Sequence, residues 1–548
     1  MALGMLSKAL RRLLSRQRTD VAGKGQCASS PDAVLSKRLR ENEALIRDAF
    51  GNSPDLIVRE IRFGVSPGIA VLVVHIDGLV NTALVSEGII KPIGIISEIL
   101  ESERLPLAQV QDMLKNRLIL LSDAKQVSDK AGFLNDIAAG KCGIIVDGSS
   151  EAFVCDVRGF EKRGVEEPQS EVVIRGSREG FSETLRVNTS LLRRRIRDPR
   201  LWIEEFTVGR VSHTQVAITY IKGIADDKVV QEVRDRITRI DVDSIQESGE
   251  LEEYIEDEPL SPFPTILRTE RPDRVAGALF EGRIAILTDG TPFVLIAPAT
   301  FLMFLTSPED YYERFFIASA VRLLRFVSFF IALLLPALYV AVTTFHQEML
   351  PTSLVLAIAA QREGVPFPAV FEALLMEVAF EILREAAVRL PKIYGPAISI
   401  VGVLILGEAA VRAGLVSSAM IIVVALTAIA SFVTPIFSLS IAVRLLRFPI
   451  ILLAGTLGLF GVVFGMSGAA IHLSSLRSFG VPFLEPIAPV VLSDLKDALI
   501  RLPWWAMDTR PKFTGENDPR RESRGLMPAV PNPQADGTLG AKGKKGPR

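Results

Sequence analysis

One helical segment of this chain is rich in charge although it lies within the most apolar third of the sequence. Residues 366–391 are PFPAVFEALLMEVAFEILREAAVRLP, in which Glu377, Glu381 and Glu385 are spaced four residues apart. Side chains at that spacing stack on one face of a helix, where like charges repel and destabilise an isolated helix. Because ionisable groups are costly at membrane depth and usually face a bundle interior or a watery cavity, the stripe indicates a polar or ionic path.

The composition indicates a soluble part and a membrane part. The length of 548 residues allows roughly three domains of ordinary size, and a mean hydropathy of +0.32 accompanies a charged fraction of 23%. A formal net charge of −1 supplies no overall field that would draw the chain to nucleic acid. The three cysteines form no CxxC pair and no cluster with histidine, which argues against a disulfide scaffold or a zinc site. We therefore expect no nucleic-acid partner, no metal and no cofactor.

The N-terminal part is expected to be a soluble α/β region that follows a short tail. The basic tail and linker, 1–33, suit either an amphipathic helix on membrane lipid or a disordered segment. The α/β region is expected to divide near residue 135 into subdomains 34–135 and 136–308. Apolar runs and Asp-Gly pairs predict strands and hairpins at 55–63, 68–80, 140–157, 202–210, 214–223 and 282–298. Helical periodicity predicts helices at 35–50, 81–115, 188–198 and 225–240.

A helical membrane domain is expected at 309–510, with about five hydrophobic helices, one of them acidic. Residues 326–345 carry no charge and have the length of a membrane span. Residues 485–502 are amphipathic and suit an interface, and the tail 511–548 is expected to be disordered. The other hydrophobic elements are expected at 366–390, 397–411, 415–443 (with a break at Pro435) and 448–473.

Four glycines of the last hydrophobic element lie on one helical face. Gly458, Gly461, Gly465 and Gly468 alternate at spacings of three and four residues. Small side chains let helices approach closely where packing drives their association. We expect this face to pack within one chain rather than between chains.

Basic residues give a prediction of topology. If the acidic helix crosses the membrane, three clusters fall on one side, which the positive-inside rule makes cytoplasmic, and the α/β region lies there too. A re-entrant acidic helix would break the pattern. The clusters are Arg314, Arg322 and Arg325 before the first span, Arg384, Arg389 and Lys392 after the acidic helix, and Arg444 and Arg447 after the long span.

Two interpretations of the acidic residues remain open. In the first, Glu372, Glu377, Glu381 and Glu408 line or guard a cation pathway, and several copies of the chain complete an acidic ring. In the second, Glu381 pairs with Arg384 and Glu385 with Arg389, and no pore is needed; Glu372 and Glu377 then lack local partners. The chain has no full P-loop, GxSxG or HExxH motif, so we expect no enzymatic activity.

Long blocks of the sequence resemble the A subunit of GerA-type bacterial spore germination receptors. In the membrane region the blocks are 366–391, SIVGVLILGEAAVRAGLVSSAMIIVVALTAIASF and RLPWWAMDTRP. In the α/β region they are DGLV, RGSREGFSETLRVNTSLLRRRI and VAITYIKGIAD. The resemblance covers about residues 35–513, and the extended N-terminus and the Pro/Gly-rich C-terminal tail depart from it.

The resemblance implies a multi-pass protein of the spore inner membrane. It implies a transporter-like B subunit and a lipoprotein C subunit as partners, and a homo-oligomer that forms a nutrient-gated cation channel early in germination. Two alternatives stay open. One is a non-conducting scaffold that relays a partner's state. The other is a SpoVA-associated A-like protein that amplifies ion release without sensing nutrient.

Overall fold

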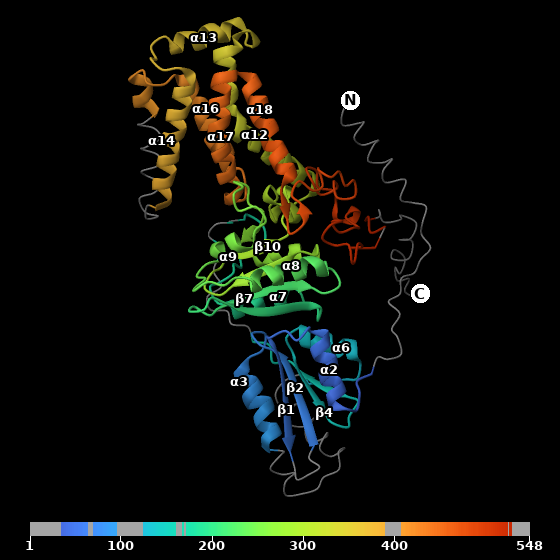
Figure 1. The fold of residues 1–548 in the computed structure, drawn as a ribbon. Coiled ribbons are helices and arrows are strands. Elements are labelled where there is room, and N and C mark those ends of the chain that lie inside the picture. Colours follow the sequence, from blue (N-terminus) through green and yellow to red (C-terminus); the bar gives the residue numbers. More distant parts are fainter. Residues whose placement is uncertain are drawn as a thin grey trace, which may run out of the picture.

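The computed structural model describes residues 34–63, 69–95, 124–159, 167–168, 171, 173–389, 407–523 and 525–528. Two α/β units precede a helical region, and the three parts follow one another along the molecule (Figure 1). The predicted fold class is therefore confirmed. The predicted tail 1–33, the second half of the predicted helical segment 81–115 and most of the predicted span 397–411 lie outside the described residues.

The first α/β unit is an antiparallel five-stranded sheet with helices on both faces. Its elements are α2 (Leu39–Ala49), β1 (Leu56–Phe63), β2 (Ile69–Ile76), α3 (Thr82–Val85), the π-helical η2 (Ser86–Ile90), β3 (Lys125–Val127), α6 (Lys130–Ala138), β4 (Cys142–Val146) and β5 (Ala152–Cys155). The strand order is β1-β2-β4-β5-β3. Leu72 and Val74 of β2 pack with α2 and α6, whereas Val71 and Val73 pack with α3 and η2. This confirms the central strand predicted from the apolar run at 68–80.

The second α/β unit has the same arrangement. Its elements are α7 (Leu185–Arg195), β6 (Leu201–Val208), β7 (Thr214–Ile221), α8 (Asp227–Thr238), α9 (Ser248–Ile255), β8 (Leu267–Thr269), α10 (Pro272–Phe280), β9 (Ile284–Thr288) and β10 (Val294–Ala297). The strand order β6-β7-β9-β10-β8 repeats that of the first sheet. Val216 and Ile218 of β7 pack with α8 and α9, and Ala217 packs on the opposite face with α7 and α10.

Equivalent side chains make equivalent contacts in the two units. Asn42 accepts a hydrogen bond from the Ser36 amide (2.9 Å) and donates to the Ser36 carbonyl (2.7 Å). Asn188 makes the same two bonds with Ser182, at 2.8 and 2.6 Å. Both asparagines are 1% exposed. Residues 35–46, LSKRLRENEALI, align with residues 181–192, FSETLRVNTSLL.

The aspartates of the two predicted Asp-Gly turns also make equivalent contacts in the two units. Asp147 follows β4 and accepts a hydrogen bond from the Leu39 amide at the start of α2 (3.2 Å). Asp289 follows β9 and accepts one from the Leu185 amide at the start of α7 (2.9 Å). A carboxylate there satisfies a free amide and stabilises the positive end of each helix. The two units are thus tandem structural repeats, which the sequence reasoning missed.

The boundary predicted near residue 135 is wrong. It falls between β3 and β4, yet β4 pairs with β2 and β3 pairs with β5, so both sides of the boundary belong to one sheet. The first sheet ends at Cys155 and the second unit begins with α7. The units are joined by a buried bidentate pair, in which Arg193 donates to Asp55 at 2.8 and 3.0 Å.

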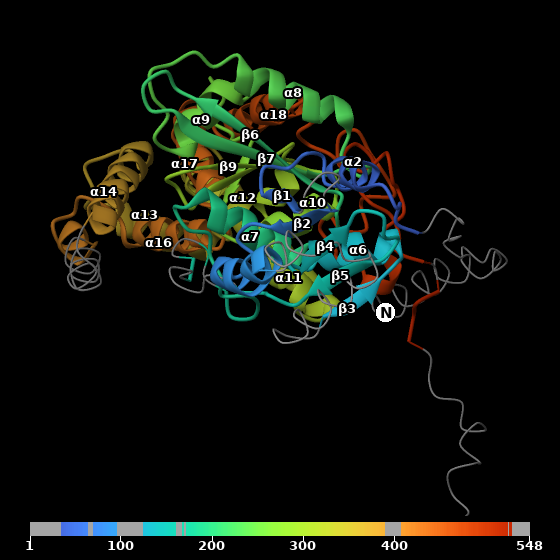
Figure 2. The same ribbon diagram turned by 90° about the horizontal axis from the view of Figure 1, so that it is seen from below.

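The helical region is built around one long helix. Its elements are α11 (Glu309–Tyr312), α12 (Phe315–Phe345), α13 (Thr352–Arg362), α14 (Ala369–Arg389), α16 (Ser418–Phe432), α17 (Phe437–Leu457) and α18 (Leu459–Ser475). Helix α12 packs with α14, α16, α17 and α18. Among the described residues, α12 and α17 are long and apolar enough to cross a membrane, and α16 and α18 are apolar but shorter. Figure 2 shows α14 at the edge of the region.

Two predicted spans are each divided in the structure. The predicted span 415–443 ends its first helix at Phe432, and a turn that contains Pro435 separates α16 from α17. The predicted element 448–473 is divided at Gly458, whose φ of 63° ends α17 and begins α18. The predicted break at Pro435 is confirmed, whereas the division at Gly458 was not predicted.

The basic residues do not all flank spans as predicted. Arg444 and Arg447 lie inside α17, and Arg322 and Arg325 lie inside α12. The sequence pattern misplaced them because a helix can bury an arginine that has a carboxylate partner on another element. The sidedness of the membrane stays a prediction.

The C-terminal segment, residues 485–523, also differs from prediction. Residues 485–502, the predicted amphipathic segment, form turns, and their position at an interface stays a prediction. Residues 511–523 were expected to be disordered, yet they pack on the second α/β unit, where Thr514 donates to the Glu281 carbonyl and Asn517 to the Ala225 carbonyl (both 2.7 Å). The remaining elements are η3 (Phe301–Phe304), η4 (Gln347–Met349), η5 (Trp504–Ala506), β11 (Arg477–Ser478) and β12 (Val481–Pro482).

Candidate functional site

The charged face of α14 is tied to neighbouring helices by ion pairs. Glu377 accepts from Arg447 of α17 at 2.5 Å, and the two side chains are 1% and 2% exposed. Glu381 accepts from Arg444 of α17 at 2.8 Å and from Arg384 of its own helix at 2.5 Å. From Glu377 to Glu381 the residue number rises along α14, while that of the partner falls from Arg447 to Arg444 along α17. Helices α14 and α17 are therefore antiparallel at this face. The sequence predicted the acidic stripe but missed its partners on α17.

The first acidic residue of α14, Glu372, also contacts neighbouring helices. Glu372 is fully buried; it accepts from the Ser417 amide at the start of α16 (2.9 Å) and pairs with Arg362 of α13 (3.3 Å). One carboxylate thus holds three helices together. The signal that could have revealed the partners is an arginine inside an apolar stretch, since such a residue requires a buried counter-charge.

Hydrogen-bonding capacity is left unused inside this site. One carboxylate oxygen of Glu377, one of Glu381 and two guanidinium nitrogens of Arg447 are buried without a hydrogen-bond partner among the described residues. An arginine–carboxylate pair usually forms two parallel hydrogen bonds, whereas Glu377 and Arg447 share one. Because a buried polar atom without a partner costs about 1–3 kcal/mol, this arrangement favours entry of a further polar group.

The predicted local pairs are confirmed, and burial falls along the stripe. Glu385 pairs with Arg389 at 2.7 Å, as predicted, and both are exposed. The exposed fraction of the side chain is 1% for Glu377, 27% for Glu381 and 65% for Glu385. Glu408 pairs instead with Arg412 four residues away. Its pairing does not join it to the network on α14.

Two of the four predicted glycines pack against a neighbouring helix of the same chain. A Cβ at Gly461 would lie 2.0 Å from the Leu453 carbonyl oxygen, and one at Gly465 would lie 3.2 Å from the Ile450 side chain. Both neighbours are on α17, which agrees with packing within one chain. Gly468 faces open space, and Gly458 is the turn itself.

A second buried charge cluster lies near the N-terminal end of α12. The Asp310 carboxylate of α11 accepts from Arg322 (3.0 Å) and Arg325 (2.7 Å), both on α12. Arg322 also donates to Asp497 of the C-terminal segment (2.7 Å), whose other oxygen accepts from the Tyr311 hydroxyl (2.9 Å). The cluster connects α11, α12 and the C-terminal segment.

The comparisons with known proteins agree over most of the chain. The profile of the family described as Bacillus/Clostridium GerA spore germination protein matches residues 44–513. Spore germination protein KA of Bacillus subtilis (strain 168) is 47% identical over 495 residues, which are 90% of this chain and 90% of that protein. Spore germination protein GerLA of Bacillus cereus is 40% identical over 473 residues, which are 86% of this chain and 95% of that protein.

One solved structure is also similar. The crystal structure of the N-terminal domain of the A subunit of the Bacillus megaterium spore germinant receptor GerK3 is 36% identical. The match covers 49% of this chain and 98% of that one, with a TM-score of 0.40.

Proposed function

Because the chain belongs to the GerA family of spore germination proteins, we propose that it is an A-type receptor subunit that conducts cations early in germination. The proposal includes a multi-pass position in the spore inner membrane, with the α/β units on the cytoplasmic side. It also includes a B-type transporter-like subunit and a C-type lipoprotein as partners. The lack of enzymatic activity stays a prediction.

The observation that supports conduction is the row of carboxylates on α14, of which Glu372 and Glu377 are buried and Glu381 is partly exposed. Glu377 and Glu381 each keep one oxygen without a hydrogen-bond partner among the described residues, and Glu372 lies on the same helix. Carboxylate oxygens with unused capacity replace the hydration of a cation when they line its path. The pairs with Arg444 and Arg447 neutralise the row in this structure, so we assign them to a non-conducting state.

The exposed side of α14 supports assembly of several copies. Phe371, Leu375, Val378 and Ile382 are 46–65% exposed and lie at spacings of four, three and four residues. This spacing forms one apolar stripe along the helix. A second copy of the chain can cover such a stripe, and so can lipid; crosslinking of single cysteines placed along α14 separates the two.

Cation flux through the purified protein in liposomes tests the proposal. We expect Glu377→Gln or Glu381→Gln to change K⁺ flux at least several-fold, because each substitution removes a charge from the path. Glu385→Gln is the matched control, since Glu385 lies on the same helix but is exposed. The control is expected to leave the flux unchanged.

Loss of the ion pair must be separated from loss of the cation site. Glu377→Gln alone leaves Arg447 buried without its partner, which costs about 3–5 kcal/mol. The double variant Glu377→Gln/Arg447→Met removes both charges and restores neutrality. Altered flux in the double variant supports a direct role of the carboxylate, whereas normal flux would show that the pair only holds α14 against α17.

A relay subunit without conduction is the second candidate. The cluster of Asp310, Arg322, Arg325 and Asp497 favours it, because these side chains connect α11, α12 and the C-terminal segment through buried pairs. A relay predicts no flux from a verified oligomer in liposomes. In that case the pore belongs to a partner.

A further inference from the structure

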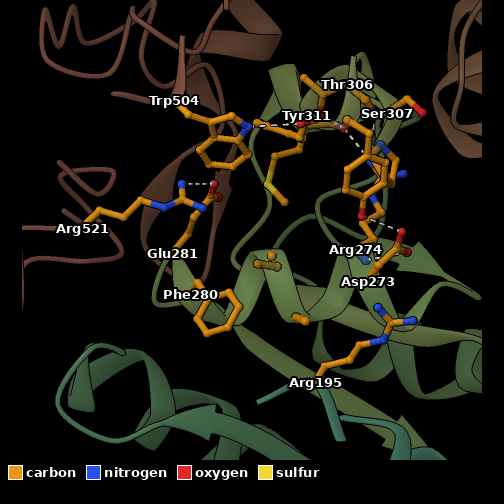
Figure 3. A pocket seen from close by; sticks show the side chains of 16 residues that line it. Arg195, Asp273, Arg274, Phe280, Glu281, Thr306, Ser307, Tyr311, Trp504 and Arg521 are labelled. Atoms are coloured by element: carbon orange, nitrogen blue, oxygen red, sulfur yellow. Dashed lines mark hydrogen bonds and ion pairs between the residues drawn. The ribbon is translucent and has the colours of Figure 1, made fainter. Parts of the chain in front are cut away.

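A cavity of about 470 Å³ lies where the second α/β unit, α11 and the C-terminal segment meet (Figure 3). Small-molecule sites commonly occupy about 300–1,000 Å³ and combine apolar walls with a few polar groups. Helix α10 lines one side, and Phe280, Tyr311, Tyr312 and Trp504 supply aromatic surface. The size and lining are those of a site for a small organic molecule.

A glycine leaves room in this cavity. Gly277 lies inside α10, where glycine is less favourable than alanine. A Cβ built at Gly277 has no neighbouring atom within 4 Å, so no close approach of another segment requires glycine there. Because Gly277 lines the cavity, a larger side chain at this position would fill it.

Most of the charges around the cavity are already engaged. Asp273 accepts two hydrogen bonds from Arg271 and one from the Tyr312 hydroxyl. Arg274 donates to the carbonyl groups of Met303 and Thr306. These groups fix the walls and have little capacity left for a ligand.

Two arginines at the ends of the cavity keep unused hydrogen-bonding capacity. The Arg521 guanidinium lies over the Trp504 ring at 5.1 Å, and its ion-pair partner Glu281 is 3.9 Å away, beyond hydrogen-bonding distance. Arg195 lies at the opposite end of the cavity, and its buried Nε has no hydrogen-bond partner among the described residues. Figure 3 shows the apolar surface of Phe280 between the two ends. Arg195 also donates to Ser177 (2.6 Å) and is paired with Glu179 (2.9 Å). Arg521 is therefore the guanidinium that is better placed to donate to a ligand.

We propose that this cavity binds a small amphipathic carboxylate, with the carboxylate at Arg521 and the apolar body between Trp504, Phe280 and Gly277. A guanidinium group matches the two oxygens of a carboxylate in geometry and charge, and the aromatic rings bury an apolar body. The ligand would contact the segments that join the second α/β unit to α12, since Trp504 donates to the Tyr311 carbonyl. The inference does not depend on conduction.

Calorimetric titration of the purified full-length protein in detergent tests the site. The probes are 4-phenylbutyrate and its neutral analogue 4-phenylbutyramide, and protein-free micelles are titrated as a blank. We expect saturable binding of the carboxylate by the native protein and by Gly277→Ala, because a methyl group leaves most of the cavity free. Gly277→Leu is expected to weaken binding at least tenfold.

Arg521→Gln tests the charge independently of the cavity volume. Hydrogen bonds to a charged group are stronger than those between neutral groups, so the preference for the carboxylate over the amide is expected to fall about tenfold or more. If Gly277→Leu does not fold, Arg521→Gln still tests the proposal. Arg521 is partly exposed, so its substitution is expected to leave the fold intact. The proposal is overturned if the native protein shows no saturable binding, if Gly277→Leu binds normally, or if Arg521→Gln keeps the full preference for the carboxylate.

Discussion

Buried charges at the scale of single residues connect elements that are distant in sequence. Arg447 reaches Glu377 across 70 residues, and Arg193 reaches Asp55 across 138. Removing one member of such a pair is costly because the other charge stays buried. The basic run 193–195 is not a uniformly solvated face, because Arg193 is 1% exposed and joins the two α/β units.

Glu485 gives a prediction of pH dependence at the same scale. It lies just after β12 and is 2% exposed, and burial raises its pKa to about 7 from 4.5. The folded state therefore holds this proton more tightly than the unfolded chain, so stability falls as the pH rises from about 4.5 to about 7. The loss amounts to about 3 kcal/mol above that range.

Glu485→Gln keeps the shape of the neutral form at every pH. We expect it to raise the melting temperature at pH 8 and to leave it nearly unchanged at pH 5, as followed by circular dichroism. Glu516→Gln is the control, because Glu516 is an exposed residue of the same C-terminal segment. An equal effect of Glu485→Gln at both pH values would contradict the assignment.

At the scale of elements, α17 and α18 form a helical hairpin whose glycines have different roles. Gly458 ends α17 with a positive φ, which a glycine adopts without steric cost. Gly461 lets α18 approach the backbone of α17, whereas Gly468 borders open space. One small-residue face therefore contains a turn, two contact points and one position free of contacts.

The same substitution in α18 is expected to act in opposite directions at two positions. Gly461→Ala places a Cβ 2.0 Å from the Leu453 carbonyl oxygen, so the hairpin must shift and stability falls, by roughly 1–3 kcal/mol for overpacking. Gly468→Ala meets nothing within 4 Å and gains about 1 kcal/mol of helix propensity. Thermal unfolding in detergent compares them, and equal melting temperatures would argue against close packing at Gly461.

At the scale of the whole molecule, two repeats of one α/β unit precede the helical region. Each repeat begins with a helix held by a buried asparagine and capped by the aspartate of its second hairpin. The C-terminal segment donates hydrogen bonds to the second repeat, at the carbonyl groups of Glu281 and Ala225. The repeats therefore share an architecture but differ in their distance from the helical region, which adjoins the second repeat (Figure 1).

Alanine substitution of the equivalent asparagines is expected to destabilise the two repeats to a similar extent. Asn42→Ala and Asn188→Ala each remove two hydrogen bonds at the start of a helix, so each should cost its own unit about 1–3 kcal/mol. Hydrogen exchange resolved by peptide is expected to rise in the first sheet for Asn42→Ala and in the second for Asn188→Ala. Exchange confined to one sheet for both variants would contradict the equivalence.

The sequence by itself determined the fold class, the local elements and the family. Apolar runs identified the central strand β2, Asp-Gly pairs identified the turns after β4 and β9, and the spacing of Glu385 and Arg389 identified their pair. These features depend on residues close together along the chain, where backbone preference and side-chain periodicity act directly.

Only the tertiary structure decided which distant residues meet. It placed β4 beside β2, paired Glu377 with Arg447 and divided the glycine-rich element at Gly458. In the tertiary structure, α10, α11 and Trp504 also line one cavity. The physical reason is that a buried charge or a strand edge specifies the kind of partner it needs, while packing of the whole chain selects the residue that supplies it.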